Sequence, residues 1–131
     1  MKPLLTILVP LLLSLTAYAQ QDYPDSGFTN KAEAKNLVVN GKKEGKWCEY
    51  LYNEGDAETY INTPDSASSY WLRIYKSGNI EGITREYYMD GKIKTIMPLD
   101  SYGNINGELK RFYSNGQLSY SDFFTKGESI G

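Results

Sequence analysis

Hydrophobic and polar residues alternate in short stretches along the second two-thirds of the chain, and glycine bounds each stretch. Three stretches open on a glycine, pass through closely spaced aromatic residues and close on a glycine turn: GKWCEYLYNEG (45–55), GITREYYMDG (82–91) and GELKRFYSNG (107–116). A period of two with many aromatic and β-branched residues is typical of β-strands. Asp-Gly and Asn-Gly tolerate the positive φ that tight hairpin turns require. The pattern predicts hairpins that turn near residues 53–55, 90–91 and 115–116.

The glycines that open these stretches belong to a regular repeat. The motif GxxxG occurs at residues 41–45, 78–82, 103–107 and 127–131, and the last three copies are 25 and 24 residues apart. Copies in register indicate a structural repeat. A glycine loop that binds phosphate needs a strand before it and a helix after it, and no helical pattern follows these motifs. We therefore interpret the glycines as turn residues.

Alternation assigns the side chains of the three copies to two faces. Counted from the second glycine of each motif, one face carries Trp47, Glu49, Thr84, Glu86, Tyr88, Leu109, Arg111 and Tyr113, and the other carries Lys46, Cys48, Tyr50, Ile83, Arg85, Tyr87, Glu108, Lys110 and Phe112. The first copy has one extra residue before its turn, so we expect a bulge near Leu51. That bulge would keep Tyr50 level with Tyr87. It would also keep Tyr52 level with Tyr88.

Neither face of these predicted strands is purely apolar. A β-sandwich would show one clean hydrophobic face for each strand. Mixed faces favour a single layer, in which cross-strand pairs of aromatic and charged residues stabilise the sheet. The sequence thus predicts an all-β fold, an elongated single-layer antiparallel meander of stacked hairpins over residues 40–131.

Two regions depart from the repeat. Residues 56–69, DAETYINTPDSASS, contain Pro, Ser and Asp and are interpreted as an inserted loop, with the question of a strand at 58–61 left open. Residues 20–39 form an N-terminal tail, in which 30–36 favours one or two helical turns. Pro98 cannot donate a ladder hydrogen bond, so we expect it at an edge or a bulge.

The first nineteen residues, MKPLLTILVPLLLSLTAYA, have the features of a secretory signal peptide. Lys2 gives a positive start, an apolar run follows, and Ala17-Tyr18-Ala19 offers the small residues that signal peptidase accepts. The run is too short for a membrane span, which needs roughly 20 apolar residues. No cysteine stands directly after it, which excludes a lipid-modified cysteine anchor. We expect cleavage before Gln20, no membrane span afterwards, and a periplasmic or secreted protein.

Composition removes several classes of function. The chain has a formal net charge of −2, which gives no reason to expect a nucleic-acid partner. It contains no histidine and a single cysteine, Cys48. Ser-His-Asp and Cys-His catalysis, histidine-based zinc sites and an internal disulfide are therefore excluded. Cys48 is interpreted as a small buried residue, with an intermolecular disulfide as the alternative. We expect no cofactor and no metal.

A carboxylate pair is the catalytic chemistry that this composition leaves. Glu49 and Glu86 occupy the same register, as the two carboxylates of a glycoside hydrolase would need to do on one face. Arg111 holds the third position of that register, however, and a Glu86–Arg111 ion pair explains the pattern without catalysis. We therefore expect that the protein is not an enzyme.

The repeat resembles the MORN-variant repeats of bacterial secreted proteins. The features that carry the resemblance are GxxxG, a strand, YY or FY, a short glycine turn and a second strand, over residues 40–131. The resemblance implies a curved antiparallel sheet and a scaffolding or binding role, and it implies no catalytic residue. Some members of the group are labelled antitoxins of toxin–antitoxin systems. That label fits poorly with a signal peptide, which directs a chain away from cytoplasmic toxins.

The function expected from the sequence is non-catalytic binding or scaffolding. Aromatic side chains on an open sheet can anchor an envelope or extracellular protein, or stack on a glycan. The residues expected to bind such a partner are Trp47, Tyr52, Glu86, Tyr88, Arg111 and Tyr113. The alternatives are a structural envelope protein that assembles through its sheet edges, aromatic residues that only stiffen the sheet, a carboxylate-dependent glycoside hydrolase and an antitoxin-like protein.

Overall fold

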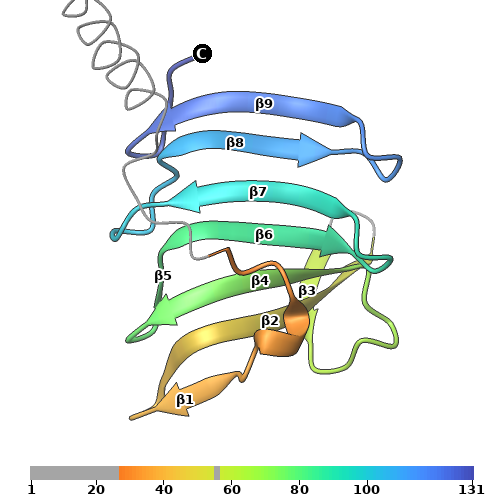
Figure 1. Ribbon diagram of the computed structural model, residues 1–131, viewed down its shortest axis with the longest axis vertical. Helices are drawn as coiled ribbons and strands as arrows, with labels where there is room; N and C mark the ends of the chain where they lie inside the picture. Colours follow the sequence, from red (N-terminus) through yellow and green to blue (C-terminus); the bar gives the residue numbers. More distant parts are fainter. Residues whose placement is uncertain (1–26, 55–56) are drawn as a thin grey trace, which may run out of the picture.

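A computed structural model of the chain describes residues 27–54 and 57–131 (Figure 1). The expected signal peptide, residues 1–19, lies outside the described residues. The elements in chain order are η1 (Lys31–Glu33), β1 (Leu37–Val39), β2 (Lys42–Glu54), β3 (Ala57–Ile61), β4 (Ser69–Lys76), β5 (Asn79–Ile80), β6 (Gly82–Tyr88), β7 (Ile93–Leu99), β8 (Gly107–Phe112), β9 (Leu118–Thr125) and β10 (Glu128–Ser129). In the part of the chain that is described, no helix has the length and apolar character needed to cross a membrane.

The strands form one antiparallel sheet in the order β1-β2-β4-β6-β7-β8-β9-β10, with β3 paired to β2 and β5 paired to β4. Three antiparallel strand pairs, β2–β4, β6–β7 and β8–β9, lie side by side in this order (Figure 1). The pairs β6–β7 and β8–β9 are hairpins, whereas β3 lies between β2 and β4 along the chain and forms a hairpin with β2. The three pairs correspond to the three copies of the sequence repeat. The predicted all-β, single-layer antiparallel meander is therefore confirmed.

Glycines hold the turns between these strands, as the sequence predicts. Ser77 and Gly78 connect β4 to β5 with φ of 50° and 86°, the pair of positive φ angles that a two-residue hairpin turn requires. Gly91 and Gly116, with φ of 91° and 89°, lie in the turns that close β6–β7 and β8–β9. No atom lies within 4 Å of the position that a Cβ on Gly116 would occupy, so backbone conformation alone requires glycine there. The turn expected at 53–55 falls partly outside the described residues.

The predicted bulge near Leu51 is wrong. β2 and β4 pair without interruption from Gly45 to Leu51, and Tyr50 lies level with Tyr87 because Tyr70 of β4 stands between them. Since no residue is added in β2, Tyr52 follows the alternation of Tyr50. It therefore lies on the opposite face from Tyr88.

The register shifts occur instead in the second strands of the next two hairpins. Glu86 pairs with Thr95 and Tyr87 with Ile93, which leaves Lys94 as an extra residue in β7. Arg111 pairs with Tyr120 and Phe112 with Leu118, which leaves Ser119 as the extra residue in β9. The two bulges occupy the same place in their hairpins, just after the turn.

The two regions outside the repeat are more ordered than expected. Residues 57–61 of the predicted inserted loop form β3, which pairs with the second half of β2. In the tail, η1 is a single 3₁₀ turn in which the Asn30 side chain caps the Ala32 N–H, and β1 follows a few residues later. Pro98 lies inside β7, between β6 and β8, and not at the edge of the sheet. The β7–β8 ladder ends at Ile96, so Pro98 lies beyond the paired residues on that side.

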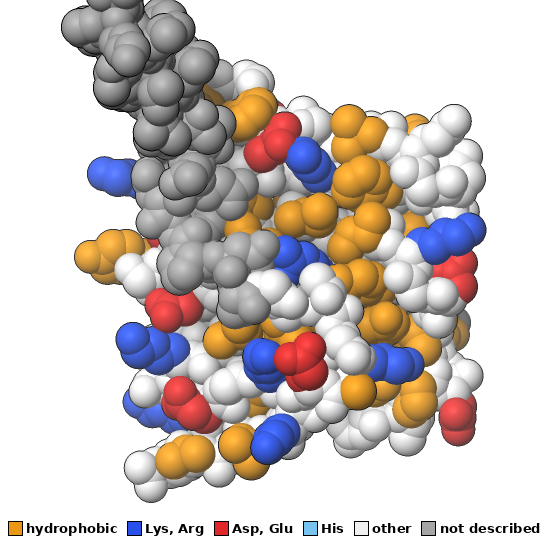
Figure 2. Space-filling view, viewed as in Figure 1, with side chains coloured by type: hydrophobic (Ala, Val, Ile, Leu, Met, Phe, Trp, Pro, Cys, Tyr) orange, Lys and Arg blue, Asp and Glu red, His pale blue; other side chains and the backbone are white. Residues whose placement is uncertain are grey.

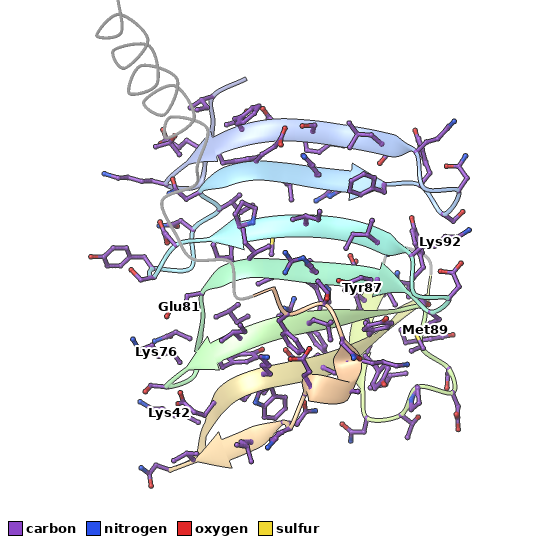
Figure 3. All side chains as sticks on the ribbon, in the orientation of Figure 1. Lys42, Lys76, Glu81, Tyr87, Met89 and Lys92 are labelled. Atoms are coloured by element: carbon purple, nitrogen blue, oxygen red, sulfur yellow. The ribbon has the colours of Figure 1, made fainter. Side chains whose placement is uncertain are left out.

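One hydrophobic core cluster lies on the face of the sheet that we call the Tyr87 face. Phe28 crosses over from the N-terminal segment and packs against Tyr70, Leu72 and Tyr87, all at most 8% exposed. Figure 1 shows this segment and η1 lying across the sheet over β2 and β4. Hydrophobic side chains gather along the middle of the same face, framed by charged ones (Figure 2). The Tyr87 side chain lies near the end of β6, close to Met89, which packs against the cluster (Figure 3).

Tyrosine supplies much of this core. The rings of Tyr70 and Tyr87 are stacked with centroids 5.3 Å apart, and the ring of Tyr50 is tilted against that of Tyr70 at 6.1 Å. Cross-strand aromatic pairs of this kind contribute about 0.5–1.5 kcal/mol beyond the area they bury. Cys48 is a half-buried free thiol beside this cluster, and burial raises its pKa.

Candidate functional site

The opposite face, which we call the Glu86 face, carries a row of polar and aromatic side chains. Ladder partners across β2, β4, β6, β7, β8 and β9 form the row Glu49, Trp71, Glu86, Thr95, Arg111 and Tyr120. The three residues that the repeat places in one register, Glu49, Glu86 and Arg111, do share this row. They are not neighbours, because the second strands of the pairs place Trp71 and Thr95 between them.

Strand β3 crosses over this face and divides it into two clefts. Tyr60 of β3 contacts Arg73, and Glu58 lies two residues earlier on the same side of the strand. The first cleft, about 490 Å³, lies between Trp47, Glu49, Tyr60 and Arg73. The second cleft, about 420 Å³, is lined by residues that include Glu58, Glu86, Tyr88, Lys94, Arg111 and Tyr113.

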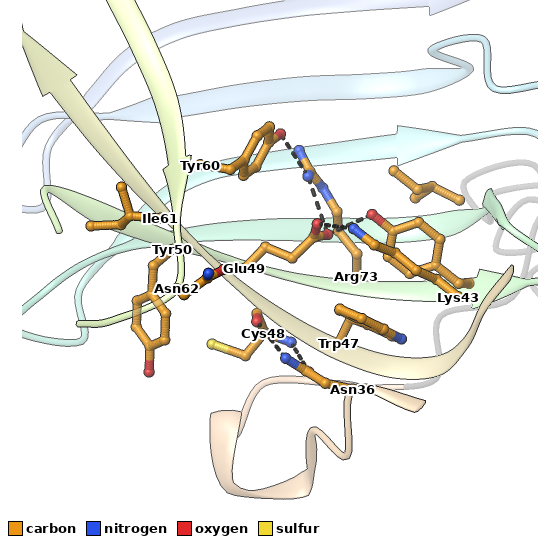
Figure 4. Close-up of a pocket in the computed structure, with 12 residues that line it drawn as sticks. Asn36, Lys43, Trp47, Cys48, Glu49, Tyr50, Tyr60, Ile61, Asn62 and Arg73 are labelled. Carbon is orange, nitrogen blue, oxygen red and sulfur yellow. Dashed lines mark hydrogen bonds and ion pairs between the residues drawn. The ribbon is translucent and has the colours of Figure 1, made fainter. Parts of the chain in front are cut away.

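The floor of the first cleft is a charged network centred on Glu49 (Figure 4). Its carboxylate accepts hydrogen bonds from Lys43 Nζ at 2.7 Å, from the Tyr75 hydroxyl at 2.5 Å and from Arg73 Nη1 at 3.4 Å. The side chains of Glu49 and Arg73 are each 10% exposed, whereas that of Lys43 is 41% exposed. Alternation explains this grouping, because Glu49 in β2 and Arg73 and Tyr75 in β4 all project from the same face.

These contacts set the ionisation of the network. Burial by itself raises the pKa of Glu49, but the hydrogen bonds from Lys43 and Tyr75 and the charge of Arg73 outweigh burial and hold that pKa below its usual value. Burial, together with the hydrogen bond to the Glu49 carboxylate, raises the pKa of Tyr75. Glu49 is therefore an ionised acceptor at neutral pH.

Arg73 lies on the floor of the first cleft and has donors to spare. Its guanidinium lies 4.5 Å from the centroid of Trp71 and 5.6 Å from that of Tyr60. Of the five N–H donors of an arginine, both hydrogen bonds present use Nη1, one to the Tyr60 hydroxyl at 2.8 Å and one to Glu49. Nε is enclosed and has no hydrogen-bond partner among the described residues. A buried donor of this kind calls for an acceptor.

The second cleft is centred on Glu86, which is 5% exposed. Glu86 accepts hydrogen bonds from the Ser69 and Thr95 hydroxyls at 2.6 and 3.0 Å, and it forms an ion pair with Lys94 at 3.3 Å. Lys94 is the extra residue of the β7 bulge, which turns its side chain toward this face. The expected Glu86–Arg111 ion pair is replaced by this one, because Thr95 stands between the two strands that carry them.

Tyr88 and Arg111 form part of the wall of the second cleft. The Tyr88 hydroxyl donates to the backbone oxygen of Phe112 at 2.7 Å, so it links β6 to β8 across β7. The Arg111 guanidinium lies 5.6 Å from the ring centroid of Tyr120. Tyr113 follows β8 and is 56% exposed. Tyr113 is therefore available to a partner, whereas Tyr88 also stabilises the sheet.

Most of the residues expected to contact a partner lie together on the Glu86 face. Four of the six, Glu86, Tyr88, Arg111 and Tyr113, line the second cleft, and Trp47 lines the first. Tyr52 lies on the opposite face, because the expected bulge in β2 is absent. Sequence reasoning missed Lys43, Tyr60, Trp71, Arg73 and Lys94. Alternation within residues 69–76 would have placed Trp71 and Arg73 on one face, but nothing in the sequence indicates that Tyr60 crosses over them.

Among residues 27–54 and 57–131, no group of three or more His, Cys, Asp or Glu side chains is placed to hold a metal ion. In comparisons with protein-family models, with curated proteins and with solved structures, nothing matches this chain. The geometry of the two clefts is therefore the basis for assigning a function.

Proposed function

We propose that the protein is a non-catalytic, extracytoplasmic binding module that holds an envelope or extracellular protein or glycan on its Glu86 face. The observation that carries this proposal is the pair of neighbouring clefts, in which aromatic rings stand beside charged side chains that are already oriented by ion pairs and hydrogen bonds. Binding sites combine apolar and aromatic walls with a few placed polar groups in this way. The resemblance to MORN-variant repeats is consistent with a scaffold of this kind and stays a prediction.

The carboxylates of the Glu86 face favour binding over hydrolysis. A glycosidase needs one carboxyl group with a raised pKa to act as the general acid. The pKa of Glu49 is lowered, and Glu86 is engaged by two hydroxyl donors and by Lys94. Trp71 also stands between the two carboxylates in the row. We expect no hydrolase activity that depends on either residue.

Tyr113→Ser tests the binding proposal, with Phe123→Ser as the matched control. Both rings are about half exposed, at 56% and 49%, and Phe123 lies on the Tyr87 face because its ladder partner is Glu108. We expect Tyr113→Ser to weaken the capture of envelope proteins or arrayed glycans by about tenfold or more, as loss of an aromatic anchor commonly does. Phe123→Ser should leave capture unchanged. Equal capture by both variants would overturn the proposal for the second cleft.

Export is the second part of the proposal, and the N-terminal sequence carries it. Cleavage after Ala19 would leave Gln20, or its cyclised form, as the first residue of the mature protein. Mass spectrometry of the protein from periplasmic and culture fractions measures this directly. An intact Met1 on protein that stays in the cytoplasm would contradict it.

A further inference from the structure

We propose that the first cleft binds a carboxylate-bearing sugar, a uronic acid unit of an oligosaccharide, with the carboxylate held by Arg73 and Lys43. The inference rests on the binding function proposed above and names the class of ligand for a cleft that the repeat pattern does not identify. The ring of the sugar packs beside Tyr60 and Trp47 on the walls of the cleft.

The charges of the two clefts differ, and the difference selects the ligand. The charged residues that line the first cleft are Lys43, Arg73 and Glu49, which leaves one positive charge in excess. The second cleft balances Glu58 and Glu86 against Lys94 and Arg111. An anionic group is therefore favoured in the first cleft, where charge complementarity adds to affinity and to the rate of association.

Donors also outnumber acceptors on the floor of the first cleft. The Lys43 ammonium has three donors, and its one side-chain hydrogen bond goes to Glu49. The Arg73 guanidinium uses only Nη1, and its Nε is buried without a partner in the described structure. A carboxylate accepts two parallel N–H bonds from one edge of a guanidinium, and such charge-assisted pairs are the strong ones. Tyr60 packs on the guanidinium and is 57% exposed, so it is the neighbour that can move to admit the ligand.

The backbone around the first cleft argues against an extended acidic peptide as the ligand. Peptides that add to a sheet need a strand edge with free N–H and C=O groups. β2 is paired with β4 along one edge, and on its other edge the Asn36 side chain bonds both the N–H and the C=O of Cys48. Recognition by the β2 floor of the cleft must therefore come from side chains. A compact ring with hydroxyls and one carboxylate fits a cleft of about 490 Å³ in that way.

Titration calorimetry with the protein tests the ligand class. The probes are trigalacturonic acid, its methyl ester, which keeps the ring but removes the charge, and a triglutamate peptide. We expect the acid to bind about tenfold or more tightly than the ester, because charge-assisted hydrogen bonds are stronger than those between neutral groups. Equal affinity for acid and ester, or binding of triglutamate alone, would overturn the inference.

Lys43→Gln is the variant that tests the residues, and Lys46→Gln is its control. Lys46 is similarly exposed and pairs with Glu33, away from the cleft. We expect Lys43→Gln to weaken binding of the acid about fivefold or more and to leave the weak binding of the ester unchanged, while Lys46→Gln changes neither. Should Lys43→Gln unfold, the salt dependence of the wild-type protein decides, because binding of the acid should weaken with salt and binding of the ester should not.

The outcomes separate this inference from the proposed function. If none of the sugars binds while Tyr113→Ser still weakens capture of a partner, the ligand class is wrong and the binding module stands. If the acid binds as expected while Tyr113→Ser has no effect, the first cleft is the site and the second is not.

Discussion

β4 and β9 are the second strands of the first and last of the three strand pairs, yet they have opposite burial. In β4, Tyr70 and Leu72 are 6% and 1% exposed. In β9, Leu118 and Tyr120 are 53% and 40% exposed. The two strands pair with their partners in the same antiparallel way, so the ladder does not cause the difference.

The cause lies in segments that are not part of the repeat. Phe28 covers β4 on the Tyr87 face, and β3 covers it on the Glu86 face through Tyr60. Neither of these two segments lies over β9 (Figure 1). The repeat therefore specifies strands and turns, while the additions to it decide where the sheet has a core and where it has clefts.

The largest effect should come from truncating the same residue type in the two strands. Leu72→Ala removes a fully buried side chain, and we expect a loss of about 3 kcal/mol in the free energy of unfolding, within the range for buried leucines. Leu118→Ala should change it by less than about 0.5 kcal/mol, as at other exposed positions. Urea denaturation of both variants measures the difference. Equal losses would show that β9 is covered in solution.

Charge should distinguish the two regions next. Glu49→Gln leaves the buried Arg73 without its anionic partner, so we expect a loss of about 2 kcal/mol or more in unfolding free energy. Glu108→Gln breaks an exposed ion pair with Lys110 near β9 and should lower it by less than about 1 kcal/mol.

The pH dependence follows from the lowered pKa of Glu49. Its contribution to stability is present above the usual glutamate pKa and is lost as the pH falls through the lower pKa of the folded state. Acidification below about pH 4.5, the usual value, should therefore destabilise the wild-type protein more than Glu49→Gln. An identical acid dependence in the two proteins would contradict the role assigned to this carboxylate.

The turns should show the smallest difference between the regions. Gly91→Val and Gly116→Val each force a β-branched residue to a φ near +90°, and we expect each to cost about 1 kcal/mol or more. Asparagine tolerates this conformation better, so Gly116→Asn should cost less. Thermal unfolding compares the three variants. Effects at Gly91 and Gly116 that differ as strongly as those at Leu72 and Leu118 would show that the turns also depend on what surrounds them.

The parts of the fold that depend on local chemistry were predictable from the sequence. Gly91 and Gly116 mark turns because few other residues adopt positive φ, and alternation correctly placed Glu86 and Arg111 on one face. The register across hairpins was not predictable, because it depends on where β4 and β7 insert Trp71 and Thr95. The contact of Phe28 with the core was also missed, since a single aromatic residue in a turn-rich tail has no periodicity.

The candidate site was predictable to a similar extent. Tyr113 and Glu86 stand out because they repeat in register. Tyr60 belongs to a segment present in one copy only, and Arg73 lies in β4, outside the glycine-bounded stretches that repeat, so no pattern draws attention to either residue. The bulge was expected at Leu51 from a residue count, whereas the extra residues lie in the second strands, where Lys94 and Ser119 follow tight turns.

Those two bulges have a consequence for how such a protein can diversify. Lys94 and Ser119 are 25 positions apart, one repeat length, and both line the second cleft while standing outside the ladder of paired residues. A substitution at either position changes the chemistry of the cleft without changing strand pairing. The repeat thus offers one variable position in each of its last two hairpins, and a combinatorial library restricted to these two residues would alter specificity on an unaltered scaffold.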